Sequence, residues 1–217
     1  MAALLIVLGA PRLVSAVVLL PGEDAVDLAK GGSRPSDAGL VRAIDAQSAA
    51  LAVLPRSDVH MDIAYLALAL SQSTNADSDR AELVGFARDH LRVALALAPG
   101  NPRGWMMLAG VRLSDGNEEA AARELQVSFA ADPHVSLLAP FRWPLTERLG
   151  GRLSREARED ANLEFLSFFR SFPEIAVRMA LRRDRLAELS ALAYENGRDR
   201  DRLVAILAKM RYQGAGT

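Results

Sequence analysis

Four prolines divide the chain into segments that each suit a pair of helices, and this spacing constrains the fold more than any other feature. Pro55, Pro99, Pro133 and Pro173 each follow an apolar run with helical periodicity, and the intervals between them are 44, 34 and 40 residues. Proline lacks the backbone N–H that a helix interior needs, so each of these residues marks a helix end. Recurrence at this interval predicts helix pairs repeated along the chain.

The composition favours an all-α fold. Half of the residues are apolar but only 6% are aromatic, so the core must be built mainly from Ala, Leu and Val. Alanine and straight-chain residues lose little conformational freedom in a helix. No stretch alternates β-branched and polar residues several times in succession, as a half-buried strand would. An irregular helical bundle is the alternative to a regular repeat.

The N-terminal segment differs from the rest of the chain. Residues 2–20 (AALLIVLGAPRLVSAVVLL) contain one charged residue, Arg12. As a helix this segment reaches about 28 Å, close to the hydrocarbon thickness of a bilayer. It therefore predicts a transmembrane anchor. Two alternatives remain: a signal peptide cleaved near Val14-Ser15-Ala16, and a core helix of a soluble domain.

The breaker residues between Gly31 and Ser36 separate this segment from the helical remainder. We expect an anchor or signal segment at 1–21, a linker at 22–36, helical repeats at 37–173, and a helical cap and tail at 174–217.

One segment, about 102–135, carries a detailed repeat signature. An aromatic residue is followed three positions later by Leu and then by a small residue. The second helix supplies a small and then a large apolar residue, a glycine stands in the turn, and a proline closes each end. The residues that define this pattern are Pro99, Trp105, Leu108, Ala109, Gly116, Ala121, Leu125 and Pro133.

This pattern resembles the tetratricopeptide repeat. The resemblance implies a solenoid of antiparallel helix pairs in which Ala109 and Ala121 face each other. Two positions depart from the family pattern, because Arg112 replaces an expected aromatic residue and Ser128 replaces an expected small one. The flanking segments match the pattern only in part. In the family, partner peptides lie on a concave face, and the corresponding candidate binding residues are Arg103, Met106, Gly110 and Leu113.

The sequence gives no support to catalytic or metal chemistry. It has no cysteine, which excludes disulfides, thiolate metal sites and thiol nucleophiles. Asp58, His60 and Asp62 are the one cluster of histidine with carboxylates, but capping of a helix N-terminus explains them better than metal binding. We expect no cofactor and no metal. The net charge of -1 gives no basis for binding nucleic acid.

These observations favour a non-catalytic scaffold that binds another protein and is tethered to a membrane by residues 1–20. From the resemblance we expect a bacterial protein of envelope or polysaccharide assembly. The residues after the anchor are acidic, so the positive-inside rule gives no reason to keep the soluble part in the cytoplasm. We expect it in the periplasm, with a cytoplasmic location as the alternative. An all-helical structural subunit of a larger membrane complex is the second hypothesis, and an enzyme is the third.

Overall fold

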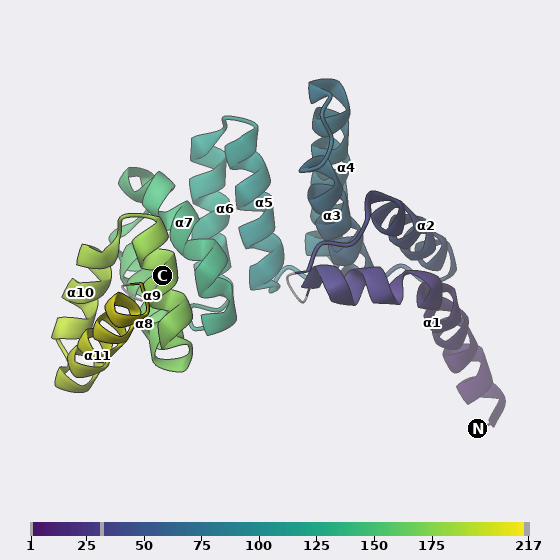
Figure 1. The fold of residues 1–217 in the computed structure, drawn as a ribbon. Coiled ribbons are helices and arrows are strands. Elements are labelled where there is room, and N and C mark those ends of the chain that lie inside the picture. Colours follow the sequence, from purple (N-terminus) through teal and green to yellow (C-terminus); the bar gives the residue numbers. More distant parts are fainter. Residues whose placement is uncertain (1, 31–32, 215–217) are drawn as a thin grey trace. The chain divides into compact units, whose positions relative to one another are not determined.

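The computed structural model describes residues 2–30 and 33–214, with side chains for residues 10–29 and 33–211. The helices are α1 (Ala2–Lys30), α2 (Asp37–Val53), α3 (Ser57–Ser71), α4 (Asp77–Leu97), α5 (Pro102–Ser114), α6 (Glu118–Ala131), α7 (Ala139–Leu149), α8 (Arg155–Ser171), α9 (Pro173–Arg182), α10 (Leu186–Tyr194) and α11 (Gly197–Gly214). Two short 3₁₀ helices are η1 (Ser136–Leu138) and η2 (Gly150–Arg152). The described residues contain no strand, so the all-α prediction is confirmed (Figure 1).

Helices end or begin at the four prolines. Pro55 lies between α2 and α3, Pro99 between α4 and α5, and Pro133 between α6 and η1, while Pro173 is the first residue of α9. The chain divides into two compact units: unit 1 is Met1–Val111 and unit 2 is Arg112–Thr217. Each unit is described by itself.

In unit 1, α1 is longer than the expected anchor. Residues 22–30, predicted to be a linker, continue the helix, and Val26 and Ala29 are buried. Pro11 and Pro21 lie inside α1. A proline removes one backbone hydrogen bond and bends a helix, and Figure 1 shows α1 bent along its length. The helix continues because its second part packs against α2.

Small residues let α1 and α2 approach closely. Ser15, Gly22 and Ala29 are buried and recur every seven residues, which places them on one face of α1. A Cβ atom on Gly22 would lie 2.8 Å from the Cα atom of Ala43 on α2. No larger residue than glycine fits this contact without moving a backbone.

The first residues of α2 and α3 make different hydrogen bonds. Ser36 caps α2, accepting a hydrogen bond from the N–H of Gly39 at 3.2 Å. At the start of α3 the N-cap residue, Arg56, makes no capping hydrogen bond with its side chain, and the hydroxyl of Ser57 donates to the carbonyl of Ala94 on α4 at 2.9 Å. Ser57 therefore ties α3 to α4.

In unit 2, the core of the C-terminal helices is aromatic. Trp143 of α7 stacks on Phe165 of α8, with ring centroids 3.9 Å apart. The other buried residues of this cluster come from α7 to α11: Ala139, Leu166, Phe168, Phe169, Ala176, Val177, Ala180, Leu189, Ala193, Leu203 and Ile206. Arg170 of α8 pairs with Asp199 of α11 at 2.7 Å, which ties the last helix to this core.

Candidate protein-binding surfaces

The predicted concave-face residues lie on α5 and offer little free surface. The Arg103 guanidinium lies 5.3 Å from the centroid of the Tyr65 ring on α3, a cation–π contact within unit 1. Met106 is only 7% exposed, and Gly110 and Leu113 are half-buried. Arg103 and Met106 therefore contribute to the packing of α5.

Half of the repeat-defining residues are buried. The indole N–H of Trp105 donates to the carbonyl of Pro99 at 2.7 Å, which joins the start of α5 to the preceding turn. Gly116 has a φ of 77° in the turn before α6. Ala109 belongs to unit 1 and Ala121 to unit 2, so their expected pairing stays a prediction. The buried members are Leu108, Ala109, Ala121 and Leu125.

The two departures from the repeat pattern carry polar contacts in unit 2. Arg112 pairs with Glu124 on α6 at 3.1 Å, so an ion pair stands where the family has an aromatic side chain. Ser128 is fully buried and accepts hydrogen bonds from Arg142 of α7, at 3.1 Å from Nε and 2.9 Å from Nη2. Arg112 thus belongs to one ion pair, and Ser128 belongs to a separate buried polar network.

Arg142 is the centre of that network, and sequence reasoning missed it. Its side chain is fully buried and pairs with Glu164 of α8 at 2.6 Å. Its other donors reach the carbonyls of Ser128 at 2.6 Å and Asp132 at 2.9 Å, and its guanidinium carbon lies 4.7 Å from the centroid of the Phe129 ring. Burial raises the pKa of Glu164 to about 7, although the charge of Arg142 acts in the opposite direction. The network joins α6, α7 and α8.

Unit 1 contains a groove of about 500 Å³ between α2, the end of α3, and α4. Val41 and Phe86 keep 45% and 38% of their surfaces exposed there. Asp79 and Glu82, both exposed, contribute carboxylates from the first turns of α4. The remaining lining residues are Ile44, Leu70, Thr74 and Leu83. We call this surface the unit 1 groove.

A histidine pair stands beside the unit 1 groove. The Nδ1 atoms of His60 on α3 and His90 on α4 lie 2.9 Å apart, and the ring of Phe86 packs on His90 with centroids 4.5 Å apart. One nitrogen must donate and the other accept, so at least one imidazole is neutral. Burial lowers the pKa of both histidines, and for His90 the charge of His60 lowers it further.

The carboxylates that flank His60 in sequence do not join it in a metal site. Asp58 pairs with Arg56 instead. Across the described residues, no group of three or more His, Cys, Asp or Glu side chains is arranged to hold a metal ion.

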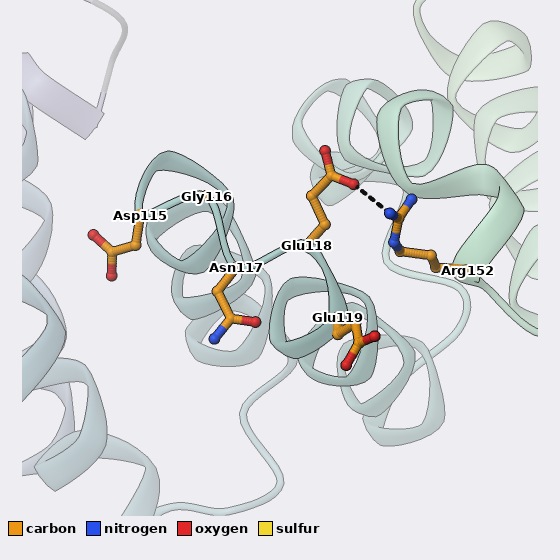
Figure 2. Close-up of a pocket in the computed structure, with 6 residues that line it drawn as sticks. All are labelled: Asp115, Gly116, Asn117, Glu118, Glu119 and Arg152. Carbon is orange, nitrogen blue, oxygen red and sulfur yellow. Dashed lines mark ion pairs between the residues drawn. The ribbon is translucent and has the colours of Figure 1, made fainter.

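A second depression surrounds the turn between α5 and α6 in unit 2 (Figure 2). Of its acidic residues, Glu118 and Glu119 begin α6, where they complement the helix dipole, and Asp115 lies in the turn. Asn117 caps α6, accepting from the N–H of Ala120 at 3.1 Å, and Glu118 pairs with Arg152 at 2.9 Å. Figure 2 shows Asp115 and Glu119 pointing away from that ion pair. Glu118 and Glu119 therefore stabilise the start of α6.

Comparison with protein-family models and with curated proteins found no match to this chain. In the described part of the chain, no helix is both long enough and apolar enough to cross a membrane. The side chains of residues 1–9, which form the first half of the expected anchor, lie outside that description.

Proposed function

We propose that this chain is a non-catalytic scaffold, built from tetratricopeptide-like helix pairs, that binds another protein through the unit 1 groove. The exposed apolar residues of the groove are the observation that supports this proposal. Val41 and Phe86 remain well exposed beside Ile44, Leu70 and Leu83. A partner that covers this surface removes apolar area from water, which favours binding by roughly 25 cal/mol per Å².

The groove fits an amphipathic helix with basic residues. Its floor is apolar, and Asp79 and Glu82 line one end of it from α4. A helix lays apolar side chains into such a groove at positions i, i+3, i+4 and i+7. Lys or Arg residues beside that stripe would pair with the two carboxylates, which selects against acidic partners.

The proposal includes a membrane tether at the N-terminus and a role in bacterial envelope or polysaccharide assembly, with unit 1 and unit 2 in the periplasm. The apolar composition of residues 2–20 supports the tether, and the repeat resemblance of residues 102–135 supports the scaffold. A structural subunit of a larger membrane complex is the second candidate. The 68% exposure of Leu13 on α1 favours it, because a neighbouring subunit would cover that residue.

A synthetic amphipathic helix of about four turns tests the groove. The peptide carries leucines on one face and lysines on both flanks, and fluorescence anisotropy measures its affinity for the full chain. We expect Phe86→Glu to weaken binding at least tenfold, equivalent to about 1.4 kcal/mol. Val93→Glu is the matched control, because Val93 is an exposed residue on the same helix, 44% exposed and outside the groove.

Absence of peptide binding by the unmodified chain would contradict the groove proposal. If Arg103→Glu abolished binding while Phe86→Glu left it intact, the α5 face would be the binding surface. Aggregation of the isolated chain in detergent-free buffer, without peptide binding, would favour the structural subunit.

A further inference from the structure

The first part of α1 presents an exposed apolar face. Leu13, Val17 and Leu20 are spaced i, i+4 and i+7, so they share one side of the helix, and they are 68%, 57% and 60% exposed. Val14 lies beside them at 48%. Four large apolar side chains over two turns form a contiguous patch, which a soluble surface rarely leaves uncovered.

The opposite side of α1 is already occupied by α2. Ser15 and Gly22 are buried there, and Gly22 meets Ala43. A Cβ atom on Gly39 would lie 4.0 Å from the Cβ atom of Ala25, so the two helices run antiparallel. The α1 helix therefore has one packed side and one exposed apolar side.

This packing argues against a helix that spans a bilayer through residues 2–20. The two helices are antiparallel, so α2 runs from Ala43 toward the N-terminal part of α1 and ends at Val53, about ten residues or ~15 Å further along α2. The non-helical residues 54–56, with the ion pair of Arg56 and Asp58, follow Val53 directly. A span would carry these polar groups into hydrocarbon, which exposed irregular backbone does not tolerate.

The charges along α1 mark where the apolar face ends. Arg12 is exposed on the flank of the face, where a guanidinium reaches lipid phosphates while its stem stays in apolar surroundings. Asp24 follows Leu20 by one turn on the same side, and Glu23 and Asp27 are exposed next to it. Residues 2–9 (AALLIVLG), by contrast, carry no charge. The arginine on the flank and the uncharged residues before it favour a lipid surface, and the acids mark where the part of α1 that lies in that surface ends.

We propose that α1 lies along the surface of a lipid bilayer, with Leu13, Val17 and Leu20 in the boundary between headgroups and acyl chains of one leaflet and α2 on the water side. The chain is thus held on the membrane without crossing it. The inference rests on the membrane tether of the proposed function and replaces its spanning helix. It involves α1 alone, so it stands independently of the groove.

Flotation of the full chain with phosphatidylcholine vesicles, with and without phosphatidylserine, tests the proposal. We expect binding to both, because one arginine adds only about 1 kcal/mol on an anionic surface. Leu13→Glu with Val17→Glu should lower vesicle binding at least tenfold, whereas Val93→Glu on α4 should leave it unchanged. Phe86→Glu should also float normally, which separates this proposal from the groove.

A single cysteine distinguishes a helix on the surface from one that spans. The sequence has no cysteine, so Ala2→Cys introduces the one thiol. With protein added outside sealed vesicles, an impermeant maleimide should label this thiol. Protection of the thiol until detergent is added would mean a span and would overturn the proposal. So would failure of the unmodified chain to float, normal flotation of the double variant, or a dimer in solution that the double variant dissociates.

Discussion

In unit 1 a hydrogen-bonded histidine pair, His60 and His90, connects α3 and α4, whereas in unit 2 an ion pair, Arg142 and Glu164, connects α7 and α8. The histidines are half-buried beside an open groove, while the arginine and the glutamate are 0% and 1% exposed. A neutral hydrogen bond near water contributes about 1 kcal/mol. An unpaired charge in a protein interior costs several times more.

The difference teaches that burial, more than the number of contacts, decides how strongly each unit depends on its polar residues. Unit 1 keeps its helices together by close apolar packing, so we expect it to tolerate changes at the histidines. In unit 2 the charged groups of Arg142 and Glu164 are buried, so each depends on the other as its counter-ion. Substitutions that leave one partner of the buried pair alone should therefore be far more damaging than losses in unit 1.

The largest expected effect comes from breaking the buried pair on one side. Glu164→Ala leaves the Arg142 guanidinium without its counter-ion and should lower the free energy of unfolding by about 3–5 kcal/mol. His90→Gln, the corresponding change in unit 1, should cost only about 1 kcal/mol. Urea unfolding followed by circular dichroism measures both.

Two controls sharpen that test. Arg142→Met with Glu164→Leu removes both charges and should recover most of the loss. Arg155→Ala breaks an ion pair whose side chains are 87% and 55% exposed and should leave stability nearly unchanged. Equal losses in the free energy of unfolding for Glu164→Ala and His90→Gln would contradict the proposed difference between the two units.

A smaller effect on stability is expected from alanine substitutions of two helical glycines in unit 1, with opposite signs at the two positions. Gly22→Ala brings a Cβ atom against the backbone of Ala43 and should cost about 1–3 kcal/mol. Gly85→Ala on α4 meets only the flexible end of Arg88 at 3.5 Å and should stabilise the chain by about 0.5–1 kcal/mol. Thermal unfolding of both variants gives the two signs. A gain at Gly22 would mean that α1 and α2 are not in close contact.

A further small effect is a pH dependence of opposite sign in the two units. Glu164 has a folded-state pKa of about 7 against an ordinary value of 4.5, so protonation favours the folded state. Unit 2 should gain about 1 kcal/mol as pH falls from about 8 to about 6. The histidines have folded-state pKa values below 6.5, although Asp89 acts to raise that of His90. Unit 1 should lose stability as pH falls below about 6.5.

Hydrogen exchange of the full chain measures the pH response of each unit separately. Mass spectrometry resolves the exchange into peptides from α3–α4 and from α7–α8. Glu164→Gln should remove the response of unit 2, and His90→Gln should reduce that of unit 1. A common response in both units, unchanged in these variants, would assign the pH dependence to other groups.

The sequence predicts what local patterns control. The helix ends at Pro55, Pro99, Pro133 and Pro173 follow from the missing N–H of proline, and these predictions are confirmed. The extension of α1 was missed because Pro21-Gly22 has the composition of a helix breaker. In the structure this glycine serves the approach to α2, so tertiary packing overrides the local preference.

The polar contacts could not be predicted from local spacing. His60 meets His90 across 30 residues of sequence, and Arg142 meets Ser128 and Glu164 across 14 and 22 residues. No periodicity connects such positions. The departure of Ser128 from the repeat pattern was the one available signal, and it gave no indication of a buried arginine. The groove depends in the same way on where α2 lies against α4, which the helix pattern leaves open.

Arg142 also has a consequence for the order in which the chain folds. Its guanidinium donates to the carbonyl of Asp132, the residue that ends α6 and whose carbonyl has no partner further along the helix, and it adds a second donor to the carbonyl of Ser128, which already accepts from the N–H of Asp132. During synthesis α6 emerges before Arg142, so the carbonyl of Asp132 lacks this donor until α7 has formed. We therefore expect the end of α6 to become fully ordered only together with α7.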